Sequence, residues 1–125
     1  MAGRLRFPAG LCSAVLLPAL CALIGCHSYH VETTVENRTG AAIQLLEVDY
    51  PNASFGADSL ASVADFHYRI QIESEGPIKV QYTTPDGQQE QITGPSVSRH
   101  QQGRLEVVLL PGGKAEFHPE LTAGR

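Results

Sequence analysis

The chain has 125 residues, of which 42% are hydrophobic and 18% are charged, and its formal net charge is −4. This length and composition are typical of one globular domain rather than two. The acidic balance disfavours nucleic acid and anionic lipid headgroups as binding partners, because both are negatively charged.

The first 25 residues have the composition of a secretory signal peptide. Arg4 and Arg6 form a basic start, and no charged residue occurs from 7 to 25. The run is apolar and ends in a small residue before a polar boundary, which is the pattern that the export machinery recognises. Residues 1–25 are therefore predicted to be removed and to take no part in the mature fold.

The end of the apolar run, Leu23-Ile24-Gly25-Cys26, resembles the lipobox of bacterial lipoprotein precursors. The resemblance implies that diacylglycerol alkylates the thiol of Cys26, that the chain is cleaved between Gly25 and Cys26, and that the new amino terminus is acylated. A cysteine suits this role because sulfur forms a stable thioether. A small residue before it gives the peptidase access to the bond.

Two other interpretations of this segment stay open. The charge-free run approaches the roughly 18 to 20 residues that span a bilayer, so an uncleaved signal anchor is one of them. Pro8, Gly10 and Pro18 argue against it, because a proline in a helix interior costs about 3 kcal/mol. The other is cleavage to a free soluble protein, in which Cys26 would be incidental.

The cysteines agree with the lipoprotein interpretation. Cys12 and Cys21 lie in the signal peptide, and the lipid would consume Cys26, so the mature chain has no thiol for a disulfide. That chain, residues 26–125, carries seven Lys and Arg against thirteen Asp and Glu, and one apolar core must stabilise it. Residues 26–30, CHSYH, are expected to be the lipidated terminus and a short tether.

The first part of the mature chain predicts two strands and a long connection. Residues 31–36 alternate apolar and polar side chains, which indicates a strand with one solvent-exposed face. The stretch 42–50, AIQLLEVDY, changes phase in the middle, which predicts a β-bulge near Leu45-Leu46 or cover on both faces. Residues 51–64 are expected to cross from one sheet to the other and to place two side chains in the core, Phe55 and Leu60.

The next part predicts a hairpin. Residues 66–73 alternate strictly, with large apolar side chains on one face, and residues 78–83 repeat the pattern. Because only a short Gly-Pro segment separates them, the two are expected to pair as antiparallel strands. Pro85-Asp86-Gly87 is expected to be the following turn, since proline presets φ and glycine accepts a positive φ.

The last part predicts three more strands. Residues 87–94 are polar, which indicates a strand at the edge of a sheet. Residues 105–110 have apolar side chains on both faces of the strand, which indicates a strand in the middle of a sheet. A turn at Pro111-Gly112-Gly113 leads into a strand at 115–118, and residues 119–125 are expected to be a tail.

The predicted fold class is all-β: an antiparallel, immunoglobulin-like sandwich of about seven strands over residues 31–118. The mature chain has no tryptophan and no cysteine pair, so nothing ties it to the antibody family. It loosely resembles small immunoglobulin-like lipoproteins, a resemblance that implies a fold and no activity.

The sequence offers little catalytic chemistry. No G-x-S-x-G, P-loop, H-E-x-x-H or C-x-x-C motif occurs, so neither enzyme activity nor a cofactor is expected. Asn37 and Asn52 begin N-x-[ST] tripeptides, which are short enough to occur by chance. The histidines are the candidate metal ligands, but a site needs three or four converging ligands. They are expected to be exposed polar residues, and no metal site is predicted at the four that were considered: His27, His30, His67 and His118.

Two functional hypotheses remain. The first is a non-catalytic envelope module, held to the membrane by the lipid on Cys26, that offers a face, an edge or its loops to an unidentified envelope protein or to the cell wall. An exposed cluster of Tyr29, Tyr50 or Phe55 near one end of the sandwich would support it. The second is a ligand-binding lipoprotein for a metal or a glycan, although the absence of tryptophan weakens the glycan version.

The residue after the lipidated cysteine predicts the membrane. In many lipoproteins of two-membrane bacteria an aspartate there retains the protein in the inner membrane, whereas this chain has His27. The resemblance therefore implies an outer-membrane anchor with the domain in the periplasm. An inner-membrane anchor and a position on the cell surface are the alternatives.

Overall fold

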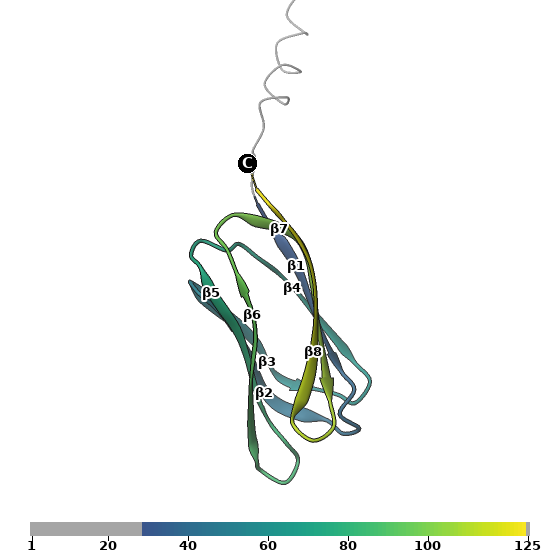
Figure 1. Cartoon of the computed structure of the whole chain (residues 1–125). Helices are drawn as coiled ribbons and strands as arrows, with labels where there is room; N and C mark the ends of the chain where they lie inside the picture. Colours follow the sequence, from purple (N-terminus) through teal and green to yellow (C-terminus); the bar gives the residue numbers. More distant parts are fainter. Residues whose placement is uncertain (1–28, 125) are drawn as a thin grey trace, which may run out of the picture.

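A computed structural model describes residues 29–124, which form two β-sheets packed face to face (Figure 1). This part of the chain contains no helix that could cross a membrane. Its strands follow in chain order as β1 (Val31–Asn37), β2 (Ile43–Tyr50), β3 (Ala53–Leu60), β4 (Asp65–Ile70), β5 (Gly76–Thr83), β6 (Gln89–Val97), β7 (Gln101–Leu110) and β8 (Lys114–Ala123).

The first sheet has the strand order β4-β1-β7-β8, and the second has the order β3-β2-β5-β6. Strands β1 and β7 are parallel, and every other pair is antiparallel. The two-sheet, all-β architecture is as predicted. The order differs from the immunoglobulin arrangement, in which the first strand pairs with the second, because here β1 lies between β4 and β7.

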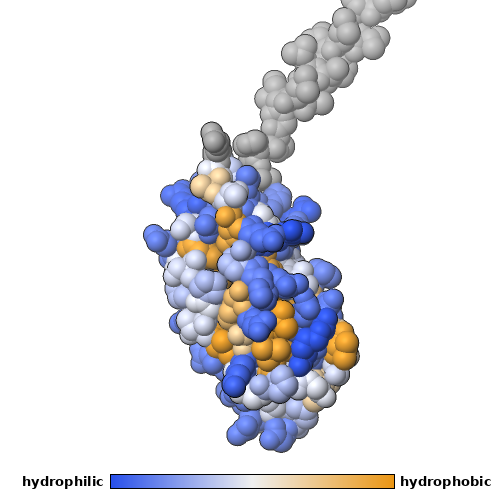
Figure 2. Space-filling model, turned by 45° about the vertical axis from the view of Figure 1, so that its right-hand side comes forward, coloured by the Kyte–Doolittle hydropathy of each residue, from blue (hydrophilic) through white to orange (hydrophobic). Residues whose placement is uncertain are grey.

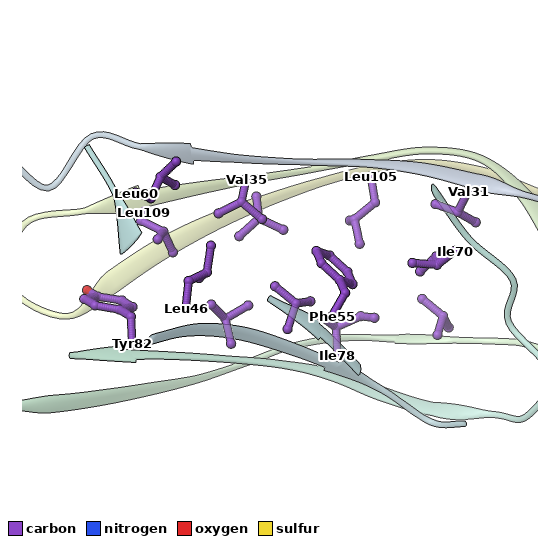
Figure 3. Close-up of a cluster of buried hydrophobic side chains, with 14 of the residues drawn as sticks. Val31, Val35, Leu46, Phe55, Leu60, Ile70, Ile78, Tyr82, Leu105 and Leu109 are labelled. Carbon is purple, nitrogen blue, oxygen red and sulfur yellow. The ribbon is translucent and has the colours of Figure 1, made fainter. Parts of the chain in front are cut away.

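The core lies between the sheets and is almost entirely aliphatic. Each strand directs alternate side chains inward, and those of the first sheet point at those of the second (Figure 3). Burying one large apolar side chain contributes about 1.5–3 kcal/mol. The residues that Figure 3 labels are Val31, Val35, Leu46, Phe55, Leu60, Ile70, Ile78, Tyr82, Leu105 and Leu109.

The predicted bulge in β2 is confirmed. The pairing of β2 with β5 shifts register between Gln44 and Glu47, and Leu45 has a φ of 53° and is 61% exposed. The extra residue lets Ile43 and Leu46 both face the core. Opposite the bulge, a Cβ on Gly56 would lie 2.1 Å from the carbonyl oxygen of Leu46, so β3 needs a glycine there.

The expectation of a long crossover at 51–64 was wrong. Residues 53–60 form β3, which pairs with β2 after a turn at Pro51-Asn52. Only residues 61–64 cross to the other sheet, and for this reason the strands number eight rather than about seven. Phe55 and Leu60 are buried as predicted, each 6% exposed.

The predicted hairpin of residues 66–73 with 78–83 was also wrong. Strand β4 pairs with β1, whereas β5 pairs with β2 and β6 in the other sheet. The alternation continues past the end of β4 at Ile70, because Ile72 is buried in the connection between the sheets. A backbone hydrogen bond of 2.8 Å from His100 N–H to the carbonyl of Ile72 fixes that connection.

The remaining strands form where they were predicted, but their bounds differ: β6 ends at Val97 rather than 94, β7 begins at Gln101 rather than 105, and β8 continues to Ala123 rather than ending at 118. Strand β6 lies at an edge, β7 lies between β1 and β8, and a turn at 111–113 joins β7 to β8. Residues 119–123 are not a tail, since they continue β8 and pair with β7 as far as Gln101 opposite Ala123.

The sandwich has two ends and two open sides. At the near end β1 begins and β8 finishes, beside the turns at 51–52, 71–75 and 98–100 (Figure 1). The far end carries the connections at 38–42, 61–64, 84–88 and 111–113. Along one side the edge strands β3 and β4 face each other, and along the other side β6 faces β8.

Candidate interaction surface

Four aromatic rings gather on the β3/β4 side. Phe55 of β3 stacks on Tyr68 of β4, with ring centroids 4.7 Å apart and an interplanar angle of 12°. Phe66 lies 6.1 Å from Phe55 and 6.5 Å from Tyr68, and Tyr50 lies 6.4 Å from Phe55. Such offset ring pairs contribute about 0.5–1.5 kcal/mol beyond their buried area. The cluster therefore joins the edges of the two sheets.

Tyr68 is the exposed member of this aromatic cluster. It is 47% exposed, whereas Phe55 is 6% exposed. The expected cluster thus forms in part: Tyr50 and Phe55 come together, Tyr29 lies elsewhere, and Phe55 is buried. The exposure of Tyr68 was not predictable from the sequence, because its side chain has the inward phase of β4 and only the position of β4 at a sheet edge exposes it. The face drawn in Figure 2 carries a hydrophobic patch in its lower half and further hydrophobic areas above it and at its right edge, bordered by hydrophilic residues.

A hollow of about 410 Å³ adjoins the cluster toward the near end. Its lining combines two tyrosine rings with amide, guanidinium, imidazole and carboxylate side chains. Burial raises the pKa of Tyr50, and the neighbouring Tyr68 raises it further. The lining residues are His30, Tyr50, Asn52, Tyr68, Arg69, Gln71 and Glu73.

The residues just before β1 pack against the domain. The ring of Tyr29 stacks on that of His100, with centroids 4.9 Å apart and an interplanar angle of 21°. His100 Nε2 lies 3.3 Å from the carboxylate of Glu73, and Gly103 N–H donates to the carbonyl of His30 at 3.1 Å. Tyr29 and His30, expected in the tether, therefore belong to the ordered domain.

Asn37 ties together two connections at the far end. Its side chain is fully buried, and its amide nitrogen donates to the carbonyls of Ala41, Leu60 and Ala61 at 2.8, 3.0 and 3.1 Å. Its amide oxygen accepts from the backbone and the hydroxyl of Thr39. All its hydrogen-bonding capacity is used, so this N-x-[ST] match marks a structural asparagine.

Asn52 does the same at the near end, but at the surface. Its amide nitrogen donates to the carbonyl of Gln71 at 3.2 Å, and its oxygen accepts from Glu73 N–H at 2.9 Å. These bonds join the β2–β3 turn to the connection that leaves β4. The sequence signal for both asparagines was their position before a strand boundary, where Asn commonly bonds to the backbone.

Two of the described histidines contact a polar side chain on their own or a neighbouring strand. His67 Nδ1 is 3.0 Å from the hydroxyl of Thr34, and His118 Nε2 is 3.4 Å from a carboxylate oxygen of Glu116. Within residues 29–124, no group of three or more His, Cys, Asp or Glu side chains is placed to hold a metal ion. His27 lies outside the described residues.

On the outer faces of the sheets, two carboxyl groups have a raised pKa, and each of them lies beside another carboxylate. The pKa of Glu36 is raised, first by a hydrogen bond shared with Glu106 and then by desolvation, and Arg38 opposes the rise. The pKa of Asp49 is raised by burial and then by its hydrogen bond with Glu47. Because its pKa is raised, the carboxyl group of Glu36, like that of Asp49, holds a proton to a higher pH than an isolated carboxyl group does.

The predicted lipidation and cleavage residues, Cys26 and Gly25, lie outside the described residues. The described part of the chain, residues 29–124, is the domain that such an anchor would hold.

Comparison with known proteins gives the fold alone. No family model matches the chain, and a search of curated proteins found no significant match. A solved structure, described as the NMR structure of a protein from Eubacterium rectale, is similar with a TM-score of 0.53 and 13% sequence identity. The match covers 77% of this chain and 91% of that one.

Proposed function

We propose that this protein is a lipid-anchored, non-catalytic β-sandwich module of the bacterial cell envelope. It is exported by the signal peptide of residues 1–25 and acylated at Cys26. It is held in the outer membrane with its domain in the periplasm, where it contacts an envelope protein or the cell wall. The lipobox at 23–26 supports the anchor. In the sequence, only His27 and Ser28 lie between Cys26 and Tyr29, the first described residue.

The observation that carries the contact function is the exposure of Tyr68 on the β3/β4 side. An aromatic ring that is 47% exposed and backed by the stacked ring of Phe55 is a rigid anchor of the kind that protein interfaces use. Neither β3 nor β4 contains a proline, whereas β6 contains Pro95 and β8 contains Pro119. Proline on an edge strand hinders pairing with another chain, so the β3/β4 side is the more accessible one.

The anchor is tested with Cys26→Ser. This change is expected to leave an unprocessed precursor and to abolish labelling with a fatty-acid analogue, because the serine oxygen forms no thioether. Cys21→Ser is the matched control, and it should leave both processing and labelling intact. Labelling that survives Cys26→Ser would contradict the proposal.

The contact surface is tested by placing a photoreactive amino acid at position 68 in living cells. A discrete crosslinked product is expected from position 68 and none from position 91, which is exposed on β6 on the opposite side. Equal products from both positions, or none from 68, would show that the β3/β4 side is not the contact surface.

A second candidate is glycan binding by the hollow beside Tyr50 and Tyr68. Its lining of aromatic rings beside planar polar side chains is the chemistry that suits a sugar, whose apolar face stacks and whose hydroxyls accept and donate hydrogen bonds. Co-sedimentation with purified cell-wall sacculi tests it. Binding that Tyr68→Ala abolishes would favour the glycan over a protein partner.

A further inference from the structure

Charged residues are unevenly distributed along the strands. The cross-strand register shows which charged residues lie in the near half of the sandwich and which lie in the far half. Glu47 and Glu106 lie midway between the two ends and are counted in neither half. The near half of residues 29–124 has four cations and five acids: Arg69, Lys79, Arg99, Arg104, Glu32, Asp49, Glu73, Glu75 and Glu120. The far half has two cations and six acids: Arg38, Lys114, Glu36, Asp58, Asp65, Asp86, Glu90 and Glu116.

The acidity of the domain therefore belongs mainly to its far half. With the histidines neutral, the formal charge is −1 in the near half and −4 in the far half. The overall charge disfavours an anionic surface as a partner, but that argument applies much less to the near end.

The near end is also the end at which the chain is fixed. Tyr29 is held by its stack on His100, which in turn is paired with Glu73. Three peptide units separate Cys26 from Tyr29, and they reach at most about 11 Å at ~3.6 Å each. Tyrosine is enriched at the boundary between headgroups and water, because its ring is apolar and its hydroxyl is polar.

We propose that the near end of the sandwich rests on an anionic phospholipid surface and that the acidic far end projects away from it. The proposal rests on the proposed lipid anchor at Cys26. A strand of ten residues such as β7 spans about 33 Å at ~3.3 Å per residue. Charge repulsion is screened over about 8 Å at physiological ionic strength. An upright domain holds its far-half acids beyond that range, whereas a domain lying flat brings them within it.

The test measures how close each end lies to the headgroups. Ser98→Cys at the near end and Gln88→Cys at the far end each add one thiol that a fluorophore can label, because the lipid blocks Cys26. Both sites are exposed. The lipidated full-length product is purified from membranes and reconstituted into phosphatidylglycerol–phosphatidylethanolamine vesicles that carry a nitroxide quencher on the headgroup.

Quenching at position 98 is expected to be at least fivefold stronger than at position 88. Equal quenching, or stronger quenching at 88, overturns the orientation. Vesicle flotation is measured first: protein that does not float overturns the lipid anchor and the orientation with it, whereas protein that floats with equal quenching overturns the orientation alone.

Arg99→Glu examines the electrostatic cause. This exposed residue lies in the β6–β7 turn at the near end, and reversing its charge changes the formal charge of the near half from −1 to −3. Quenching at position 98 is expected to fall at least twofold on the anionic vesicles and to be unchanged on phosphatidylcholine vesicles. An unchanged signal on both overturns the role assigned to charge.

Discussion

The two open sides of the sandwich are closed by different means. On the β3/β4 side, stacked aromatic rings join the sheet edges in the middle, and Asn37 and Asn52 tie the connections at the two ends. On the β6/β8 side, the ring of Phe117 packs over Gly94, where an added Cβ would lie 2.6 Å from the ring. The β3/β4 side is therefore closed by stacked rings and side-chain hydrogen bonds, whereas on the β6/β8 side an aromatic ring packs against a glycine.

This difference shows how a small domain without a disulfide closes its core. Side-chain hydrogen bonds and stacking leave an aromatic ring available at the surface, as Tyr68 is. The ring of Phe117, in contrast, packs against Gly94 and is partly buried. The comparison therefore also explains why the β3/β4 side is the candidate contact surface.

The largest expected effect comes from removing the ring that is central to the β3/β4 side. Phe55→Ala should cost about 3–5 kcal/mol of unfolding free energy, the usual range for a buried phenylalanine. Phe117→Ala, which removes a partly buried ring from the other side, should cost about half as much. Urea unfolding of the two variants gives both values, and equal losses would contradict the ranking of the two sides.

The next effect concerns the asparagines that tie the β3/β4 side. Asn37→Ala removes every hydrogen bond that this fully buried side chain donates and accepts, and it should cost about 2–3 kcal/mol. Asn52→Ala should cost less than about 1 kcal/mol, because water replaces its bonds at the surface. Thermal unfolding followed by circular dichroism would measure the pair, and a larger loss at Asn52 would show that burial does not decide the ranking.

A smaller effect should appear at Gly94 on the β6/β8 side. Gly94→Ala forces the ring of Phe117 to move and should cost about 1–2 kcal/mol. Combined with Phe117→Leu, the same change should cost less than the sum of the two single changes, because the smaller side chain makes room. A double-mutant cycle from urea unfolding gives this coupling, and additive losses would mean that the close contact is not strained.

The smallest effect lies on the central strands, away from both sides. Because the folded state raises the pKa of Glu36, its contribution to stability is fully present below the unfolded pKa and is lost as pH rises through the folded value. Glu106→Gln should bring the pKa of Glu36 back toward its ordinary value, which an NMR titration of the carboxyl carbon would detect. A raised pKa that persists in this variant would mean that Glu106 is not its main cause.

The alternation of polar and apolar side chains predicted most of the strands, but it predicted fewer of the pairings between them. The bulge in β2 was predictable because the apolar phase changes within Leu45-Leu46, and that change depends on nothing outside the strand. That β4 and β5 lie in different sheets was not predictable, since Ile72 keeps the alternation of β4 while the chain already crosses between the sheets. Of the surface residues, Tyr50 was anticipated, but Tyr68 was not, because exposure at an edge depends on the strand order.

The sequence by itself determined that residues 31–118 form an all-β domain, because a period of two in side-chain polarity requires strands with one buried face. It also predicts the anchor at Cys26, since export and acylation would act on the chain before the fold forms. Tertiary structure alone decided the strand order, the extension of β8 to Ala123, and the incorporation of Tyr29 and His30 into the domain. It likewise separated a nearly neutral near end from an acidic far end. Each of these depends on residues distant in sequence that meet only when two sheets share one core.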